Sequence, residues 1–366
     1  MSTAEHSGPV LEVRNLTTSF HTRDGVVRAV DGVNLTVNPG EVLGIVGESG
    51  CGKSVTSMSI MGLVPKPGRI ESGEVLFDGV DLLTLSSKEL ADLRGDRISM
   101  IFQQPQSALN PVHRVGGQIA EVYKIHKAMR SAVGNERATE ALRMVGIPDP
   151  STRSRAYAHE MSGGMAQRVM IAMALALEPE LLIADEPTTA LDVTIQAQIL
   201  DLMRGLQRDF GTAVMLITHD LGVIAEMADR VAVMYAGEIV EESTVQELFD
   251  NPQHPYTQGL IGSIPVLGRE RETLDTIPGI VPRLVDLGPG CRFADRCAAR
   301  VEAGLDRCFT ERPNLVDDGN GHAVRCWLHS DDDPAPSDVA VGDAVTRSAV
   351  TGSAVTGSAA ASGGEE

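Results

Sequence analysis

The sequence predicts an α/β fold built on a mostly parallel sheet with helices on both faces. From residue 167 to residue 235, helical patterns alternate with apolar strand patterns, which is typical of parallel sheets. A glycine-rich segment directly after an apolar strand is a second indication, because such segments join a strand to a helix in nucleotide-binding sheets. The hydrophobic content of 42% is enough to fill a large core.

The N-terminal part is expected to be β-rich, because short apolar runs there are separated by Gly and Pro turn signals. The expected strands are 10–13, 26–30, 33–37, 41–46 and 70–79. The expected turns are Asp24-Gly25, Asp31-Gly32, Pro39-Gly40 and Asp78-Gly79. We expect an antiparallel β subdomain in this N-terminal part, beside the main sheet.

Helical and alternating patterns follow. Apolar residues recur every three or four positions from about 112 to 146, so 105–160 is expected to be a helical subdomain. The helices expected after it are 167–177, 193–210 and 221–228, and the strands are 181–184, 212–217 and 231–235. This alternation is the basis of the parallel-sheet prediction.

Charge and hydropathy limit the classes of partner. The chain has 50 acidic and 31 basic residues and a formal charge of −19, so its long-range field repels nucleic acid, which we do not expect as a partner. No signal-peptide pattern is visible at residues 1–9. The longest apolar run, 169–177, is about half of the ~20 residues that a membrane span needs. We expect a cytosolic chain that reaches a membrane only through a partner.

The strongest motif is the loop GESGCGKS, which follows the strand pattern ending at Val46 and matches the phosphate-binding pattern GxxxxGK[ST]. Glycines let backbone N–H groups converge on phosphate oxygens, and the next helix adds its dipole. We expect Lys53 to reach the β- and γ-phosphates and Ser54 to ligate Mg²⁺. The expected phosphate-binding residues are Gly47, Glu48, Ser49, Gly50, Cys51, Gly52, Lys53 and Ser54.

A second acidic motif complements this loop. The apolar strand Leu181–Ala184 delivers Asp185 and Glu186 at its carboxyl end, where ligands bind in open α/β sheets. Asp185 suits Mg²⁺, and Glu186 suits the polarisation of an attacking water. Alone, such a pair is more often a helix cap, but together with a phosphate loop it favours a nucleotide site.

Two further segments allow two interpretations each. Ser162, Gly163 and Gly164 at a helix start are either a flexible turn or a second anion site made of a hydroxyl and backbone N–H groups. His219 directly follows the strand 212–217, and a single His at a strand end is more often structural than functional.

Taken in order, these motifs resemble those of the ATP-binding subunits of ABC transporters, over roughly residues 10–262. The motifs that carry the resemblance are the loop 47–54, Gln103, Ser162-Gly163-Gly164, Asp185-Glu186, Thr189-Ala-Leu-Asp192 and His219. Six motifs in the family's order make the resemblance specific. It implies an ABC ATPase fold and the hydrolysis of ATP with Mg²⁺.

The resemblance also assigns roles. Glu186 matches the catalytic base, and His219 matches the residue that contacts the γ-phosphate. Gln103 matches the loop that senses Mg²⁺ and water and touches the membrane subunits, and Asp192 matches the loop that couples the two sites of a dimer. Phe20 lies where the family places an aromatic residue that stacks on adenine, where Tyr is commoner but a phenyl ring stacks equally well.

Family members form a head-to-tail dimer, in which each ATP lies between the phosphate loop of one subunit and the signature segment, here Ser162–Gly164, of the other. The general signature ends in Gln, whereas this chain has Met165, as peptide-importer ATPases do. The doubled Gln103-Gln104 leaves the sensor ambiguous by one residue. We prefer Gln103, because it directly follows Phe102 as in the family.

The region after residue 251 indicates a substrate. His254-Pro255-Tyr256 reads physically as a stiff linker that opens a short helix. It resembles the extension of ATPases that power dipeptide and oligopeptide importers, as does Ser107-Ala-Leu-Asn110-Pro111. The alternatives are an importer ATPase for nickel, glutathione or another small solute. A soluble ABC ATPase acting on ribosomes or DNA is disfavoured, since neither tandem nucleotide domains nor a long coiled coil is visible.

Four of the five cysteines cluster in this extension with the spacing C-x5-C-x10-C-x17-C. The spacing matches neither the zinc patterns nor the ferredoxin patterns, and free buried cysteines are the simplest interpretation. Their clustering in a region with little apolar sequence favours a metal, and some peptide-importer ATPases carry a [4Fe-4S] cluster in a similar extension. We expect such a cluster, with zinc or no metal as alternatives, on Cys291, Cys297, Cys308 and Cys326.

The expected organisation is a nucleotide-binding domain (1–251), an extension (252–330) and a disordered acidic tail (331–366). The resemblance implies a second ATPase subunit, identical or paralogous, and two membrane permease subunits. A solute-binding protein outside the membrane would act indirectly. The implied location is peripheral, at the cytoplasmic face of the membrane.

Overall fold

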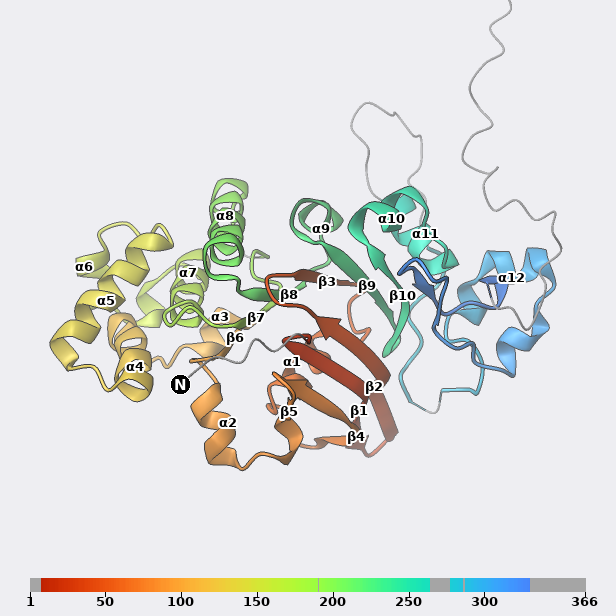
Figure 1. The fold of residues 1–366 in the computed structure, drawn as a ribbon, viewed down its shortest axis with the longest axis horizontal. Coiled ribbons are helices and arrows are strands. Elements are labelled where there is room, and N and C mark those ends of the chain that lie inside the picture. The colour runs from red at the N-terminus through yellow and green to blue at the C-terminus, as the bar shows by residue number, and fades with distance from the viewer. Residues whose placement is uncertain (1–7, 190, 264–276, 286, 330–366) are drawn as a thin grey trace, which may run out of the picture.

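The computed structural model describes residues 8–189, 191–263, 277–285 and 287–329. The tail expected at 331–366 lies outside these residues. In Figure 1 the described part is elongated, with the helices α4–α7 at one end, the two sheets in the middle and the extension with α12 at the other end.

A mixed sheet of eight strands forms the centre, in the order β11-β12-β10-β9-β3-β8-β7-β6. The strands are β3 (Val42–Val46), β6 (Ile98–Ile101), β7 (Leu181–Asp185), β8 (Ala213–Ile217), β9 (Arg230–Tyr235), β10 (Glu238–Thr244), β11 (Val316–Asp317) and β12 (Ala323–Val324). The five from β9 to β6 are parallel, whereas β10, β12 and β11 are antiparallel. The predicted α/β class is therefore confirmed.

The second sheet is antiparallel, in the order β2-β1-β4-β5. Its strands are β1 (Leu11–Thr22), β2 (Gly25–Val37), β4 (Gly68–Phe77) and β5 (Val80–Asp81). The turn predicted at Asp31-Gly32 is wrong, because β2 runs through it. The pairing of β1 with β2 shifts register between Leu16 and Thr18, so Asp31 and Gly32 form a bulge opposite β1. A local turn signal does not distinguish a bulge from a strand end.

Helices α7, α8 and α9 pack on one face of the central sheet, and α1 packs on the other together with the antiparallel sheet (Figure 1). The helices in the described residues are α1 (Lys53–Ile60), α2 (Ser87–Leu93), α3 (Pro105–Ala108), α4 (Val115–Lys127), α5 (Ser131–Met144), α6 (Pro150–Arg153), α7 (Gly163–Ala174), α8 (Val193–Phe210), α9 (Leu221–Met227), α10 (Val245–Asp250), α11 (Pro255–Gly262) and α12 (Ala298–Ala303). Short 3-10 turns occupy Leu82–Thr84, Ala158–Glu160, Ala294–Arg296, Asp306–Phe309 and Trp327–His329. Within the helical pattern noted from 112 to 146, Ala128 ends α4 in a left-handed conformation and so separates it from α5.

Two hydrophobic cores lie on opposite faces of β3, because side chains alternate along a strand. Val42 and Val46 belong to the core that includes residues of α7, α8 and α9. Leu43 and Ile45 belong to the other core, together with Ile60 of α1 and the inner face of the antiparallel sheet. The carboxyl ends of the parallel strands, where the expected site residues lie, are therefore held between two packed layers.

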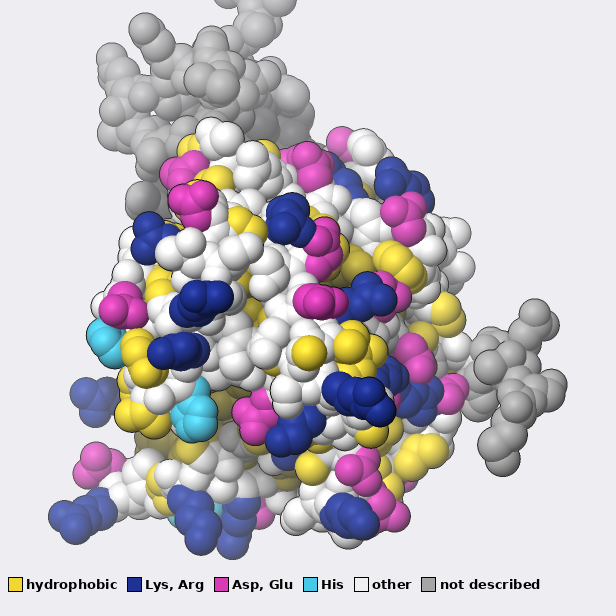
Figure 2. Space-filling view, turned by 90° about the vertical axis from the view of Figure 1, so that its left-hand side faces the viewer, with side chains coloured by type: hydrophobic (Ala, Val, Ile, Leu, Met, Phe, Trp, Pro, Cys, Tyr) yellow, Lys and Arg dark blue, Asp and Glu magenta, His cyan; other side chains and the backbone are white. Residues whose placement is uncertain are grey.

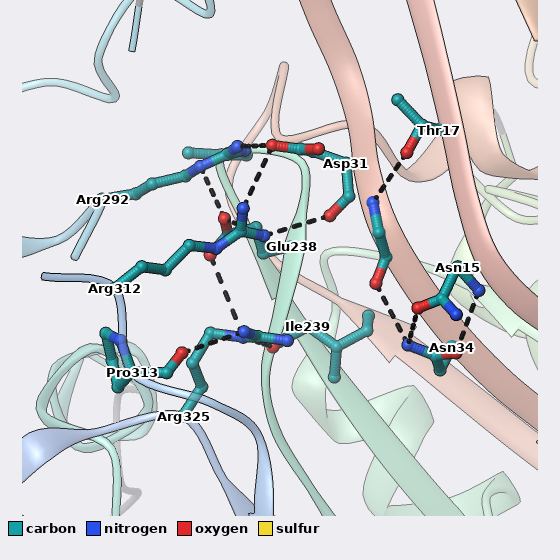
Figure 3. Close-up of polar contacts among 12 residues, drawn as sticks. Asn15, Thr17, Asp31, Asn34, Glu238, Ile239, Arg292, Arg312, Pro313 and Arg325 are labelled. Atoms are coloured by element: carbon teal, nitrogen blue, oxygen red, sulfur yellow. Dashed lines mark hydrogen bonds and ion pairs between the residues drawn. The ribbon is translucent and has the colours of Figure 1, made fainter. Parts of the chain in front are cut away.

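The extension is bound to the rest of the chain by backbone pairing and by a buried ion-pair network (Figure 3). The N–H of Arg28 on the edge strand β2 donates to the Leu284 carbonyl at 3.0 Å. In the network, Arg292 Nε lies 2.7 Å from Glu238 Oε1, and Arg312 pairs with the same carboxylate. Burial raises the pKa of Glu238, and the surrounding arginines oppose that rise.

The helical end of the molecule carries mixed charge. Figure 2 shows Lys, Arg, Asp and Glu side chains interspersed over this face, with hydrophobic side chains scattered among them. No continuous basic stripe is visible on this face.

Candidate functional site

The loop between β3 and α1 has the geometry of a phosphate cradle. Gly47 (φ 153°) and Gly52 (φ 114°) adopt conformations that disfavour other residues. A Cβ on Gly47 would lie 2.1 Å from the Met234 carbonyl oxygen, and one on Gly52 would lie 2.2 Å from the Ala29 carbonyl oxygen. Both glycines are therefore required by the close approach of other backbone segments, and α1 begins directly at Lys53.

Lys53 is buried at the start of α1, with 6% of its surface exposed. Its Nζ donates to the Gly47 carbonyl at 2.7 Å and to the Glu48 carbonyl at 3.1 Å. Only backbone carbonyls and the sulfur of Cys51, at 3.6 Å, contact this ammonium within the described residues. The ammonium is thus held beside the loop without a carboxylate partner, as a phosphate-binding lysine requires.

Asp185, at the end of β7, has the properties of a Mg²⁺ ligand. Burial raises its pKa to about 6, against the opposing effects of the Ser54 hydroxyl and Lys53. Its Oδ1 is buried and has no hydrogen-bond partner. A buried carboxylate oxygen without a partner is costly unless a cation or water satisfies it. Ser54 and Asp185 lie together and supply hard oxygen donors, so these two side chains fit Mg²⁺.

Glu186 follows Asp185 and is held in a left-handed conformation (φ 48°). Thr189 Oγ1 donates to its Oε2 at 3.0 Å, and His219 Nδ1 lies 3.3 Å from its Oε1. Burial favours a higher pKa for Glu186, yet the hydrogen bonds from Gln103, Thr189 and His219 outweigh it and lower the pKa. Glu186 is therefore an ionised acceptor at neutral pH, as a base for water must be.

Three predicted residues from distant parts of the sequence thus meet, since Gln103 and His219 both contact Glu186. Gln104 instead lies 3.3 Å from Ser107 Oγ, which favours Gln103 as the sensor. Thr189 is a further partner of this carboxylate, which the motifs did not predict. Its place three residues after Glu186, in the segment that ends at Asp192, was the available signal.

The signature segment lies apart from this group of residues. Ser162 caps α7 by accepting a hydrogen bond from the Met165 N–H at 3.3 Å, and Gly163 and Gly164 begin the helix. A Cβ on Gly163 would meet no atom within 4 Å. The helix α7 contacts α3, α4 and α5. Asp192 caps α8 through the Ile195 N–H at 3.1 Å. The N–H groups at the N-terminus of α7 are thus arranged as in other helix starts that can bind an anion.

Phe20 lies on β1 beside α1. It pairs with Gly68 on β4, and a Cβ on Gly68 would come within 2.6 Å of the Phe20 ring. Thr18, two residues before it on the same strand, contacts Ser59 of α1 at 2.8 Å, so this face of β1 is the one toward α1. The arrangement keeps Phe20 on the side of the sheet where a nucleotide would lie.

A large cavity in the described part of the chain does not coincide with the phosphate loop. It measures about 940 Å³ and lies between the outer face of the antiparallel sheet and the extension. Its lining includes Ser19 and His21, which alternate with Phe20 and therefore face the opposite way. Arg28, Arg292 and Arg312 complete the wall. It is a junction between parts of the chain, separate from the nucleotide site.

The four clustered cysteines converge in the extension. Cys291, Cys297, Cys308 and Cys326 all line one small cavity, and none forms a disulfide. Burial raises the pKa of the Cys291 and Cys326 thiols to about 12. In the described residues, no group of three or more His, Cys, Asp or Glu side chains is arranged to hold a metal ion, so the structure does not support the expected iron–sulfur cluster. Cys51, the fifth cysteine, is buried in the phosphate loop.

Comparison with known proteins agrees with this geometry. Residues 30–189 match the ABC transporter family model, and residues 240–303 match the model of the oligopeptide/dipeptide transporter C-terminal region. A probable peptide ABC transporter ATP-binding protein of Sinorhizobium fredii is 54% identical over 320 residues, covering 87% of this chain and 94% of that protein. The chain belongs to the ATP-binding subunits of ABC transporters.

Other ABC ATP-binding subunits are similar over the same span. The dipeptide transport ATP-binding protein DppD of Bacillus subtilis is 52% identical, over 87% of this chain and 94% of that protein. Among solved structures, the post-hydrolysis dimer of the ATP-binding cassette MJ0796, bound to ADP and Pi, is 30% identical with a TM-score of 0.60. It covers 64% of this chain and 98% of its own length. This ABC subunit is therefore an ATPase, with Mg²⁺ as the usual metal of the family.

Among the described residues of this ABC subunit, no helix has the length and hydropathy that crossing a bilayer requires.

Proposed function

We propose that this ABC subunit hydrolyses ATP to power the import of dipeptides or oligopeptides through a membrane transporter. The observation that carries the proposal is the C-terminal region at 240–303, which matches the oligopeptide/dipeptide transporter model and follows the ATP-binding region directly. Relatives that cover 87% or more of the chain include dipeptide and oligopeptide transport ATP-binding proteins. A nickel or glutathione importer is the alternative, because other chains select the solute.

Each site residue has a proposed role. Lys53 and the N–H groups of the loop 47–54 bind the phosphates, and Phe20 stacks on adenine. Ser54, Asp185 and Gln103 serve Mg²⁺ and its water shell. Glu186 accepts the proton of the attacking water, while His219 orients that water against the γ-phosphate. Support for the last two roles comes from the contact of Gln103, Thr189 and His219 with one ionised carboxylate.

The ATP sites are proposed to be completed by a second subunit, identical or paralogous. The signature segment Ser162–Gly164 begins a helix that packs on α3, α4 and α5, so its free N–H groups are available to another copy's nucleotide. Asp192, at the cap of α8, would transmit the state of one site to the other. The similar cassette MJ0796 was solved as a dimer with ADP and Pi.

The proposed assembly places two membrane permease subunits against the Gln103 region, and a solute-binding protein delivers the peptide outside the membrane. The chain would be peripheral, on the cytoplasmic face. Within it, we assign 1–251 to the nucleotide-binding domain, with the helical subdomain at 105–160. The extension is 252–330, and the acidic segment from 331 lies outside the described residues.

The function is tested in the assembled transporter in vesicles. Peptide-loaded solute-binding protein is expected to raise phosphate release severalfold over unloaded protein, because loading shifts the transporter toward the closed ATPase dimer. The measurement is phosphate release with dipeptides, pentapeptides, Ni²⁺ and glutathione supplied in parallel. Stimulation by Ni²⁺ or glutathione and not by peptides would assign the chain to the alternative importers.

The cysteine cluster is proposed to hold a [4Fe-4S] cluster with a structural role. The proposal starts from the four unpaired thiols that line one cavity. Each cysteine of such a cluster binds a different iron, so the site does not need the single-ion arrangement that zinc requires. Burial and the other thiols raise the pKa of Cys326, which disfavours a bare thiolate unless a metal compensates it.

Anaerobically purified protein is expected to be brown and to contain about four irons per chain. Cys326→Ser should lose most of the iron and the visible absorption. Cys51→Ser, which changes the only cysteine outside the cluster, should keep both. Colourless wild-type protein with four reactive thiols and no iron would refute the cluster, and stoichiometric zinc would replace it with the alternative.

A further inference from the structure

Glu48, the second residue of the phosphate loop, has all three of its polar groups held at once. Its backbone N–H donates to the Tyr256 hydroxyl at 2.8 Å. Its carbonyl accepts from Lys53 Nζ at 3.1 Å. Its carboxylate accepts two bonds from the Arg296 guanidinium, at 2.6 and 3.1 Å. Two residues of the C-terminal extension therefore hold Glu48, Tyr256 at the backbone N–H and Arg296 at the carboxylate.

Tyr256 and Arg296 are each fixed in place by contacts of their own. Tyr256 lies in α11, is fully buried, and has its ring 4.6 Å from the Tyr235 ring and 5.5 Å from Phe293. Arg296 ends the 3-10 turn Ala294–Arg296 and exposes 5% of its side chain. Its Nε donates to the Pro278 carbonyl at 2.7 Å, and its Nη1 lies 3.3 Å from the Tyr235 hydroxyl. A planar guanidinium so fixed on a carboxylate is a geometric restraint as well as a charge.

The Glu48 carboxylate would oppose nucleotide binding if it were not paired. It sits in the loop that receives the phosphates, and a negative charge there repels them at short range. Arg296 neutralises this charge, and its bidentate contact directs the carboxylate toward the extension. Tyr256 accepts from the N–H of the Gly47–Glu48 peptide, and the carbonyl of that same peptide, Gly47 O, accepts from the Lys53 ammonium at 2.7 Å.

We propose that Tyr256 and Arg296 are positioning residues of the ATP site, through which the C-terminal extension sets the affinity of the phosphate loop for nucleotide. The proposal rests on the proposed role of Lys53 and its loop in binding phosphates. It gives the extension a direct function at the nucleotide, because Arg296 lies between Cys291 and Cys297, and those cysteines line the extension's own core. The folding of the extension thereby affects the geometry of the phosphate loop, through the ion pair of Arg296 with Glu48 and through the Tyr256 hydroxyl.

The test uses the full-length chain and a fluorescent ATP analogue with Mg²⁺. Tyr256→Phe keeps the ring contacts and leaves the Glu48 N–H without its acceptor, so the Kd is expected to rise about 3- to 10-fold. Arg296→Gln is expected to raise it by a similar factor, because it leaves the Glu48 carboxylate unpaired beside the phosphates. Tyr123→Phe and Arg307→Gln, which alter a buried tyrosine of α4 and an arginine beside Trp327, serve as matched controls with unchanged Kd.

A double-mutant cycle separates positioning from general stability. Arg296→Gln in a Glu48→Gln background should cause little further loss, since no carboxylate then needs neutralising, whereas it should cause its full loss in the wild type. In the assembled transporter, KM for ATP should rise more than kcat falls. Arg296→Lys should recover part of the affinity by restoring the charge without the bidentate contact.

The outcomes distinguish the positioning role of Tyr256 and Arg296 from the phosphate-binding role of Lys53 and its loop. Lys53→Ala is expected to abolish binding of the analogue. Full affinity in Tyr256→Phe and Arg296→Gln, with binding lost in Lys53→Ala, would overturn the positioning role alone. Equal losses for Arg296→Gln in both Glu48 backgrounds would also overturn it, since the arginine would then act through folding. Unchanged binding in Lys53→Ala would instead refute the phosphate-site assignment.

Discussion

Glu186→Gln is expected to stop ATP turnover while ATP binding remains. The amide is nearly isosteric with the carboxylate and can still accept from Thr189, but it cannot take a proton from water. General base catalysis typically contributes about 10²- to 10⁴-fold, so phosphate release should fall by at least about 100-fold. The Kd for MgATP should stay within about threefold, because Lys53 and its loop are unchanged. The measurements are phosphate release by the assembled transporter and binding of an ATP analogue.

Glu180→Gln is the matched control for this prediction. Glu180 lies just before β7, is exposed, and pairs with Arg97 at 2.6 Å, away from the site. It should retain wild-type turnover. If Glu186→Gln hydrolysed ATP within tenfold of the wild type, Glu186 would not be the base, and the ionised carboxylate held by Gln103, Thr189 and His219 would have a purely structural role.

The sequence predicted the parts of this site that local pattern determines. Three such parts are the phosphate loop, the strand that ends in Asp185 and the capped helix at Ser162. Each is recognised within fewer than ten residues, from the residue types at the boundary of a helix or strand. The family resemblance then gave a role to Ser162–Gly164 and to His219, each of which allowed two interpretations when taken alone. The contact of Gln103 and His219 with Glu186 follows from parallel strands, since their carboxyl ends meet at one edge of the sheet.

Other features could not be predicted, because their causes lie far apart in the chain. The contacts of Glu48 with Tyr256 and Arg296 span 208 and 248 residues, and no local signal connects them. The strand pattern of β10 was missed because it carries three glutamates, Glu238, Glu241 and Glu242. The structure pairs them with arginine and histidine partners, Arg292 with Glu238, His322 with Glu241 and Arg230 with Glu242. Alternation of apolar residues cannot reveal a strand whose buried charges are neutralised by another segment.

The second large effect is expected on stability in acid, and its source is His254. This side chain is 1% exposed and caps α11, where its Nδ1 accepts from the Tyr256 N–H at 3.0 Å. Burial lowers its pKa to about 3, and the positive charges of His329 and Arg325 add to the shift. The backbone N–H of His254 donates to the buried Glu241 carboxylate at 2.8 Å. Protonation of Nδ1 would place an N–H donor opposite the Tyr256 N–H, so the hydrogen bond that caps α11 would be lost.

The direction in which stability changes with pH follows from the linkage between proton binding and folding. In the unfolded chain His254 binds a proton near its ordinary pKa of about 6.5, whereas the folded chain does not bind it until about pH 3. The unfolded state therefore gains protons first as the pH falls. The contribution is fully present above about pH 6.5 and is lost progressively below it, by about 2 kcal/mol between pH 7 and pH 5. Urea unfolding of the full-length chain at these two pH values measures the loss.

His254→Asn isolates this effect, because asparagine is a good helix N-cap and does not titrate. The variant should be less stable than the wild type at pH 7, where its smaller side chain leaves space in the packing. Its further loss on going to pH 5 should be smaller than the wild-type loss by about 2 kcal/mol. His113→Asn, at an exposed position before α4, should retain the wild-type acid loss. Equal acid losses in the wild type and His254→Asn would show that His254 takes up its proton in the folded chain, and the neutral cap of α11 would then be the wrong description.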